Sequence, residues 1–314
     1  FQGCIFPPEG AAFAVFRISL INFISGTSFV KALTENRFSI PSFIFIILLS
    51  NFVGSYIIYN KHLKGAIYMI GDMQNWRPNV AGIIEHARSM HPNTEVVSRL
   101  VSGEIHKTNY EEVCIRSRKL ASALEKDGIK KGDVVATLAL NTYRHLEMYY
   151  GISGMGAITH TLNFRLHPEQ AVYIINHAED KMIFVELPFV PILEGLQDNL
   201  STVEKYVVLC NEDEMPETSL KNALSYEEYI KNGDENYSWP EMDDDAACAL
   251  CYTSGTTGNP KGVLYSHKSN ILHAQVALTA MTIQADDSIL MVVPLFHVLA
   301  WGIPYFGPMN GNKL

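Results

Sequence analysis

The sequence predicts an α/β fold in which helices cover a mostly parallel β-sheet. Short apolar runs at residues 133–140, 181–186 and 206–210 have the length of buried strands. Segments with helical spacing of apolar residues separate these runs. Strands that are joined through helices of this length run parallel, because a parallel pair needs a long crossover connection.

The first helix is expected shortly after Thr108, since the spacing of Thr108 and Glu111 is that of a capping box. Apolar side chains then recur with a helical period from Tyr110 to Leu124. Gly128 fits the end of this helix, because glycine is the residue that most easily leaves helical geometry.

A second helix is expected over residues 143–155, where several glycines indicate close packing against a neighbour. A third begins after His167, with Pro168 at an early position where its missing N–H is not needed. Residues 212–245 are polar and acidic, which is typical of surface loop with a short helix. We interpret Glu227, in this stretch, as part of a solvated helix face.

Charge and cysteine content exclude some function classes. The chain has 314 residues and a net charge of −9 without a block of lysine or arginine, so we expect no nucleic-acid binding. Five cysteines form no disulfide framework and favour a reducing, cytoplasmic location. Cys248 and Cys251 have CxxC spacing, but no second pair of zinc ligands accompanies them, so we interpret them as buried strand residues.

The first 68 residues differ in composition from the rest and allow two interpretations. Residues 40–59 carry no charge and are long enough for a membrane helix, with Lys61 and Lys64 on its cytoplasmic side. Alternatively, residues 1–68 are not native protein but upstream sequence joined to a gene that starts at Met69 or Met73. Membrane association is expected only under the first interpretation.

A loop at residues 253–262 has the composition of a phosphate-binding site. It follows a strand-like apolar run at residues 246–252 and precedes another strand or helix. Its glycines let backbone N–H groups approach an anion closely, and its four hydroxyls can donate to phosphate oxygens. Lys261 adds a positive charge. Because Pro260 precedes and Gly262 follows this lysine, the loop is not of the Walker type.

The string TSGTTGNPKG in this loop resembles the signature of the adenylate-forming superfamily, which includes acyl-CoA synthetases, peptide-synthetase adenylation domains and beetle luciferases. The segments NFRLHPEQ at 163–170, PLFHV at 294–298 and WGIPY at 301–305 are similar to further family segments. The last of these most resembles medium- and long-chain fatty acyl-CoA synthetases. The resemblance covers residues 69–314 and implies the first part of an AMP-binding domain that is incomplete, because the family's later motifs do not follow.

The resemblance implies an AMP-forming acid–thiol ligase that uses ATP, Mg²⁺ and CoA together with a small carboxylic acid. Lys261 and His297 are then the catalytic residues, and His297 also lies between acyl substrate and nucleotide. Trp301 matches an aromatic gate over the acyl tunnel, and ordinary packing in the core is the equal alternative for this side chain. The phosphates of ATP are expected to be held by Thr253, Ser254, Gly255, Thr256, Thr257, Gly258 and Lys261, and Thr253 is also the expected magnesium ligand.

Two other functions stay open on the sequence alone. One is an aryl-CoA ligase or another adenylating enzyme, and the other is a membrane-anchored, non-catalytic remnant. We expect the chain by itself to be an inactive fragment, and we leave open whether it forms a homodimer.

Overall fold

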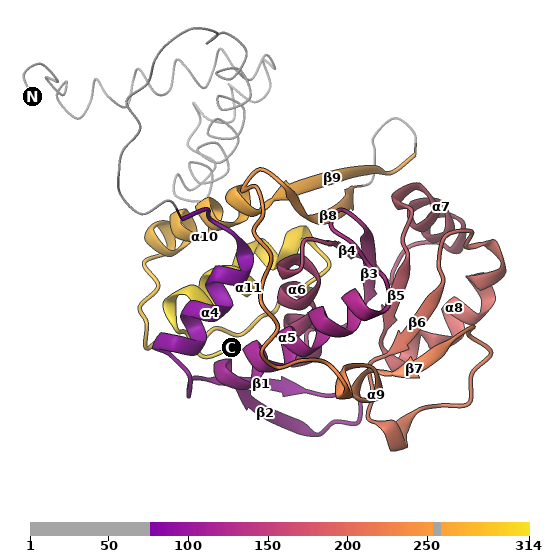
Figure 1. Ribbon diagram of the computed structural model, residues 1–314, viewed down its shortest axis with the longest axis horizontal. Helices are drawn as coiled ribbons and strands as arrows, with labels where there is room; N and C mark the ends of the chain where they lie inside the picture. The colour runs from indigo at the N-terminus through magenta and orange to yellow at the C-terminus, as the bar shows by residue number, and fades with distance from the viewer. Residues whose placement is uncertain (1–75, 254–258) are drawn as a thin grey trace, which may run out of the picture. The chain divides into compact units, whose positions relative to one another are not determined.

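The computed structural model describes residues 76–253 and 259–314. Seven strands of these residues form one sheet in the order β7-β6-β5-β3-β4-β8-β9 (Figure 1). Neighbouring strands are parallel, except that β8 and β9 are antiparallel. The predicted mostly parallel sheet is therefore confirmed. Its strands are β3 (Val134–Leu138), β4 (Ile158–Thr161), β5 (Met182–Val185), β6 (Lys205–Val208), β7 (Ala223–Ser225), β8 (Ala247–Thr253) and β9 (Lys261–Ser266).

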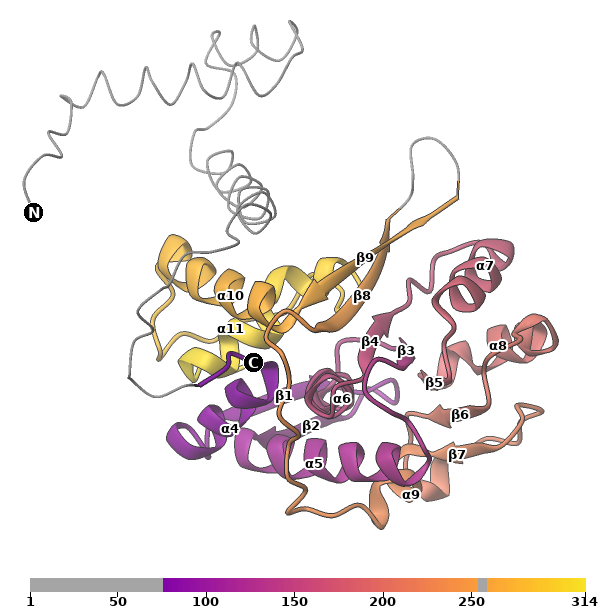
Figure 2. The same ribbon diagram turned by 45° about the horizontal axis from the view of Figure 1, so that its top comes forward.

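Helices cover both faces of this sheet (Figure 2). Side chains alternate between the two faces along each strand, so Phe184 packs towards α5, α6 and α9 while Ile183 packs towards α7 and α8. Val207 and Val208 divide in the same way. These helices are α5 (Tyr110–Lys126), α6 (Tyr143–Gly154), α7 (Pro168–Ala178), α8 (Val190–Leu196) and α9 (Tyr226–Lys231).

A further group of elements packs around α6 and β8. It contains a small antiparallel hairpin, β1 (Glu95–Arg99) with β2 (Ile105–Asn109), and the helices α4 (Val80–Met90), α10 (His267–Met281) and α11 (Ile303–Asn310). Their apolar side chains form one core with Tyr149, Tyr150 and Cys248. Every residue of α6 is buried, so this helix is the centre of the described part of the chain.

The glycines of α6 allow the close packing that the sequence predicts. A Cβ atom on Gly151 would lie 2.7 Å from Cδ2 of Leu120 in α5, and one on Gly154 would lie 2.6 Å from the ring of Trp239. Both distances are shorter than van der Waals contact. The predicted start of α7 is also confirmed, with Pro168 as its first residue.

The predicted capping box at the start of α5 is wrong by one residue. Asn109 is the N-cap, and its side-chain oxygen accepts a hydrogen bond from the backbone N–H of Glu112 at 2.9 Å. Thr108 is still part of β2, where it pairs with Val96 of β1. Sheet pairing therefore keeps the chain extended for one residue longer than the local pattern indicates. The helical face from Tyr110 to Leu124 is buried as predicted.

The polar stretch at residues 212–245 contains the expected short helix, α9, but also a strand that the sequence did not predict. This strand, β7, has three residues and pairs in parallel with β6 at the edge of the sheet. It is too short to show alternation of apolar and polar residues, and only its contact with β6 identifies it.

Part of the predicted organisation lies outside the described residues. This applies to the extension 1–68, to the candidate membrane helix 40–59, and to residues 254–258 of the loop. Among the residues that are described, no helix combines the length and the apolar character needed to cross a membrane.

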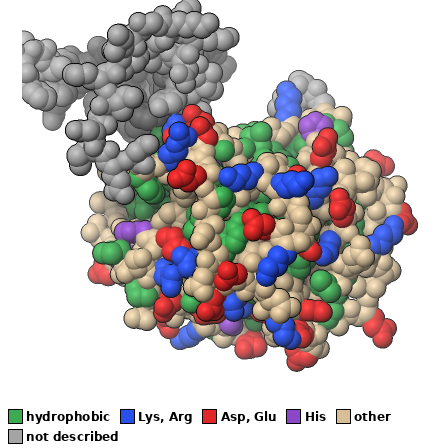
Figure 3. Space-filling view, in the orientation of Figure 1, with side chains coloured by type: hydrophobic (Ala, Val, Ile, Leu, Met, Phe, Trp, Pro, Cys, Tyr) green, Lys and Arg blue, Asp and Glu red, His purple; other side chains and the backbone are tan. Residues whose placement is uncertain are grey.

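Charged side chains of both signs are interspersed on the face shown in Figure 3. Several of them pair across the surface, for example Lys231 with Glu212 at 2.8 Å and Lys221 with Asp198 at 3.1 Å. Exposed pairs of this kind contribute little to stability, because water and salt screen their charges. They do not determine how the layers pack.

A partly buried network of charges lies between α5, α6 and α9. Arg116 of α5 contacts Glu147 at 2.7 Å and Glu227 at 2.9 Å, and Arg144 contacts Glu227 at 3.0 Å. The expectation that Glu227 belongs to a solvated face is therefore wrong. Burial opposes the charge on Glu227, but the hydrogen bonds and charges of the two arginines outweigh it and lower the pKa of this carboxyl group.

Glu186 is a buried carboxyl group at the end of β5. Only 4% of it is exposed, and its Oε2 accepts a hydrogen bond from the backbone N–H of Leu140 at 3.3 Å. Burial raises its pKa to about 7, because the charged form loses solvation that this hydrogen bond and Arg144 only partly replace. The charge of Glu186, which lies between the carboxyl ends of β3 and β5, is therefore expected to change near neutral pH.

We predict that Gly151→Ala lowers the free energy of unfolding by about 1–3 kcal/mol, because the added methyl group collides with Leu120. The change raises helix propensity by only about 1 kcal/mol, so the collision should dominate. The matched control is Gly195→Ala in α8, where a Cβ atom meets nothing within 4 Å. Urea unfolding measures both variants, and equal effects would contradict the packing explanation.

We also predict that Glu186→Gln removes a loss of stability above neutral pH. A carboxyl group with a raised pKa stabilises the fold below its unfolded value, 4.5, and this contribution disappears as the pH rises through about 7. The glutamine keeps an acceptor for Leu140. Between pH 5 and pH 8 its stability should therefore rise relative to the wild type by up to about 3 kcal/mol. Unfolding in urea at both pH values measures this difference. The same stability difference between variant and wild type at pH 5 and pH 8 would show that the pKa of Glu186 is not raised.

Candidate active site

The predicted phosphate loop connects β8 to β9. Thr253 is the last residue of β8 and pairs directly with Lys261, the first residue of β9. Both residues are exposed to solvent. The two described ends of the loop, a hydroxyl group and an ammonium group, therefore lie opposite each other. The other predicted phosphate contacts, Ser254, Gly255, Thr256, Thr257 and Gly258, lie outside the described residues.

Tyr252 ties the strand that leads into this loop to the neighbouring elements. A hydrogen bond of 2.6 Å joins its hydroxyl group to Nδ1 of His177 in α7. Its ring also lies 5.2 Å from the ring of His160 in β4, measured between centroids. The last turn of α7 and the adjacent strand thus fix the position at which the loop begins.

His160 is itself held by a buried carboxylate. Its Nδ1 lies 2.8 Å from Oδ2 of Asp180, and neither side chain is exposed. Burial raises the pKa of Asp180, against the opposing attraction of His160. No pattern in the sequence indicates this pair, because the two residues are in different elements and neither belongs to a known spacing pattern.

The second part of the candidate site lies at the end of β4. The hydroxyl group of Thr161 donates a hydrogen bond of 3.3 Å to the carbonyl oxygen of Phe296 and lies 3.3 Å from Sγ of Cys251 in β8. The ring of Phe296 contacts Phe164 edge-on at 4.9 Å between centroids. Phe296 is buried, but the next residue, His297, is exposed. The structure thus places His297 beside the carboxyl ends of β4 and β8.

Trp301 lies in an unusual turn, η4 (Val298–Gly302), that begins directly after His297. Its first four residues have φ values between 47° and 57°, the left-handed region. This conformation raises the energy by roughly 1–2 kcal/mol for each residue other than glycine. Nε2 of His273 in α10 lies 3.1 Å from the carbonyl oxygen of Trp301. The Trp301 residue is 44% exposed, so it is not an ordinary core tryptophan.

The two cysteines at CxxC spacing are buried, as predicted. Cys248 and Cys251 are at most 5% exposed. Burial raises the pKa of Cys248 to about 12, and it also raises that of Cys251. Both thiols therefore stay protonated at neutral pH and act as small apolar groups in the strand.

Magnesium would need oxygen ligands near the phosphate loop, and the hydroxyl group of Thr253 at the end of β8 suits this chemistry. Among the described residues, one cluster of acidic side chains is compact enough to share a metal ion, and it consists of Asp243, Asp244 and Asp245. It precedes the opposite end of β8, at about 20 Å from Thr253 for a strand of this length. Its members pair with Arg77 and Lys268. These aspartates do not fit the role of ligands at the loop.

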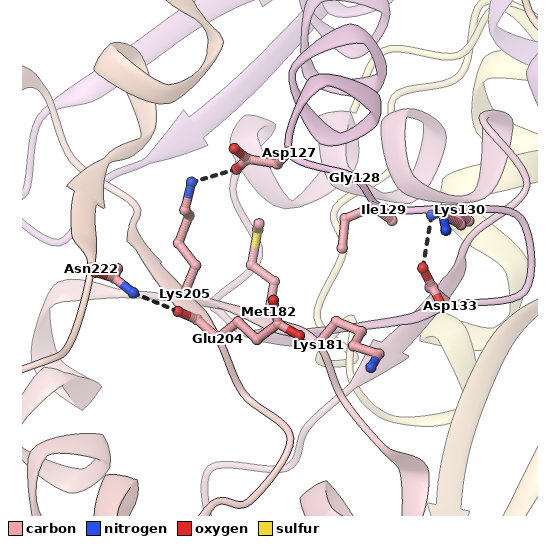
Figure 4. Close-up of a pocket in the computed structure, with 10 residues that line it drawn as sticks. All are labelled: Asp127, Gly128, Ile129, Lys130, Asp133, Lys181, Met182, Glu204, Lys205 and Asn222. Atoms are coloured by element: carbon pink, nitrogen blue, oxygen red, sulfur yellow. Dashed lines mark hydrogen bonds and ion pairs between the residues drawn. The ribbon is translucent and has the colours of Figure 1, made fainter.

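A cavity of about 460 Å³ lies at the opposite edge of the sheet, where β5 and β6 begin. In Figure 4, Lys205 contacts Asp127 and the backbone of Lys130 contacts Asp133. The lining contains three lysines and three acidic residues and therefore has no net charge. It contains none of the residues that the sequence assigns to the site.

Comparisons with known proteins agree with this geometry. The family model for AMP-binding enzymes matches residues 84–314. The medium-chain-fatty-acid–CoA ligase of Ectopseudomonas oleovorans is 45% identical over 248 residues, which cover 78% of this chain and 45% of that protein. The 3-methylmercaptopropionyl-CoA ligase of Ruegeria pomeroyi is 43% identical over 246 residues, which cover 78% and 46%. The chain thus spans about half the length of these curated relatives.

The fold is also found in solved structures. A long-chain-fatty-acid–CoA ligase from Archaeoglobus fulgidus superposes with a TM-score of 0.67 at 22% identity, covering 78% of this chain and 48% of that chain. At this identity the likeness concerns the fold. Together with the family match and the sequence relatives, it shows that the chain belongs to the AMP-binding enzyme family, as the loop at residues 253–262 indicated.

Proposed function

We propose that the chain forms part of an AMP-forming fatty acyl-CoA synthetase. In the first step a carboxylate oxygen attacks the α-phosphorus of ATP, and pyrophosphate leaves as the acyl-adenylate forms. In the second step the thiol of CoA attacks the acyl carbonyl carbon and AMP leaves. The observation that carries this proposal is the loop at residues 253–262, which joins two strands at the carboxyl edge of the sheet.

The loop would act on the leaving group of the first step. Negative charge grows on the β- and γ-phosphates as the bond to the α-phosphorus breaks. Lys261 and the hydroxyl and N–H groups of residues 253–258 can bind these phosphates and stabilise that charge. Because Thr253 and Lys261 pair across the hairpin, both can contact one triphosphate. Magnesium that enters with ATP would neutralise part of the phosphate charge, with Thr253 as a ligand.

His297 is suited to the substrate side of the site. It is exposed at the carboxyl edge, directly after a residue that is fixed to β4. In this position its imidazole can donate a hydrogen bond to the carboxylate or to the acyl-adenylate and hold it close to the α-phosphorus. Fixing two reacting groups in this way removes most of the entropy loss from the reaction step.

The acyl substrate is proposed to be an aliphatic carboxylic acid. The two relatives named above carry aliphatic acyl groups in their names, one a medium-chain fatty acid and one a short thioether acid. Trp301, four residues after His297 in the chain, offers an exposed apolar surface for such a chain. A cytoplasmic location fits a ligase that uses ATP and CoA.

We predict ATP–pyrophosphate exchange in a chimera that joins residues 69–314 to the C-terminal part of the Ectopseudomonas oleovorans ligase, the part that this chain does not match. Exchange should depend on octanoate and be much weaker with benzoate. Lys261→Ala should reduce it by roughly tenfold or more, since one charged contact to phosphate is lost. The control is Lys221→Ala, a change at an exposed lysine of the opposite sheet edge. Preference for benzoate would instead favour an aryl-CoA ligase.

We also predict that residues 69–314 alone catalyse no exchange, because the family motifs for adenine and ribose do not follow in this sequence. The same radiochemical assay with octanoate tests this prediction. Exchange above that of the Lys261→Ala variant would show that these residues contain a complete adenylation site.

A further inference from the structure

One side chain connects β3 to the segment that leads to His297. Asn141 is the third residue after β3. Its Nδ2 donates hydrogen bonds to the carbonyl oxygens of Met291 at 3.0 Å and Val293 at 2.9 Å. Its Oδ1 accepts a hydrogen bond from the backbone N–H of Leu295 at 2.8 Å. Both donors of the carboxamide and its oxygen therefore bind one stretch of backbone.

The backbone that Asn141 binds lies outside the regular helices and strands. Residues 289–294 form neither helix nor strand, so their polar backbone groups need partners from elsewhere. The three groups that Asn141 binds belong to alternate residues of this segment, 291, 293 and 295. The side chain thus takes the place of a neighbouring strand.

Apolar side chains hold this segment on one side only, through Ile289 and Met291, which are partly buried against the core. Leu290 is 84% exposed and Val292 is 77% exposed, on the side away from the protein. Hydrophobic contacts through these side chains cannot fix the backbone. The hydrogen bonds to Asn141 therefore act together with the packing of Ile289 and Met291 to set the path of this backbone.

Two further hydroxyl groups hold the residues between this segment and His297. The hydroxyl group of Tyr149 in α6 donates to the carbonyl oxygen of Leu295 at 2.5 Å. That of Thr161 donates to the carbonyl oxygen of Phe296 at 3.3 Å. His297 follows at once and is exposed. Its position is thus set by contacts that begin at Asn141.

Asn141 is itself held in place. The N–H group of the preceding residue, Leu140, binds Glu186, and the carbonyl oxygen of Leu140 lies 3.0 Å from Nδ1 of His145. On the other side, the N–H group of Tyr143 donates to Ser98 at 2.8 Å. A side chain that is anchored in this way can impose its geometry on the segment that it binds.

We propose that Asn141 is a positioning residue: its carboxamide fixes the backbone of residues 291–295 against the end of β3 and thereby sets the place of His297 near the carboxyl end of β4. This role rests on the proposed function, in which His297 orients the acyl substrate. Asn141 need not touch the substrate itself. It acts through the backbone that precedes His297.

The test compares Asn141→Ala with the wild type in the 314-residue chain by amide hydrogen exchange and by NMR of the histidine rings. The resonance of His297 is assigned with His297→Gln. Loss of the three hydrogen bonds should speed exchange of the amides at residues 295–297 by roughly tenfold or more. The His297 ring signals should shift, while exchange in β3 and β5 stays unchanged.

A matched control is Asn176→Ala. Asn176 in α7 also binds a loop through its carboxamide, donating to the carbonyl oxygen of Asn199 at 2.8 Å and accepting from the N–H of Ser201 at 2.9 Å. Within the described part of the chain, no hydrogen bond joins α7 to residues 291–297. Its replacement should leave the exchange at 295–297 and the His297 signals as they are.

Asn141→Asp separates the two halves of the carboxamide. The carboxylate keeps an acceptor for Leu295 but loses both donors to Met291 and Val293, so faster exchange and a shifted His297 signal are again expected at pH 7.

Unchanged exchange and signals in Asn141→Ala would overturn the proposal, and so would equal changes in Asn176→Ala. Global unfolding of Asn141→Ala would also overturn it, because the effect would then not be local. None of these measurements needs catalysis, so a chimera without activity would overturn the proposed function alone.

Discussion

The parallel pairing of β8 with β4 is the contact on which the rest of the site depends. It is short, with Thr159 opposite Ala249 and His160 opposite Leu250. The hydroxyl group of Ser153 strengthens it by a hydrogen bond of 2.7 Å to the carbonyl oxygen of Cys248. This pairing brings the start of the phosphate loop next to the end of β4, where the segment before His297 is bound. Ligands of open α/β sheets bind at such carboxyl ends.

Most of the fold could be predicted because its signals are local. The strands that were predicted are apolar runs, the helices show an apolar period, and the loop at residues 253–262 carries its own signature. The predictions from the sequence are wrong where a contact with a residue far along the chain determines the structure. Pairing with β1 keeps Thr108 extended and makes Asn109 the helix cap, while Arg116 and Arg144 bind Glu227 and leave it only partly exposed. No pattern along the chain reports such contacts.

The candidate site shows the same limit. Lys261 and His297 could be named from the sequence, but what positions them could not. Asn141 lies 154 residues before Leu295, its partner, and nothing around it differs from an ordinary turn. On the far side of His297, the left-handed turn from Val298 to Trp301 is a conformation that local preferences disfavour. The substrate side of the site is thus built from long-range hydrogen bonds and local strain.

The most direct test of the proposed site is a crystal structure of the chain with MgATP. The triphosphate is expected against the loop at residues 253–262, with Nζ of Lys261 within about 3 Å of a β- or γ-phosphate oxygen. Nucleotide bound elsewhere, for instance in the cavity beside Lys130 and Lys181, or a triphosphate that makes no contact with Lys261, would contradict the account.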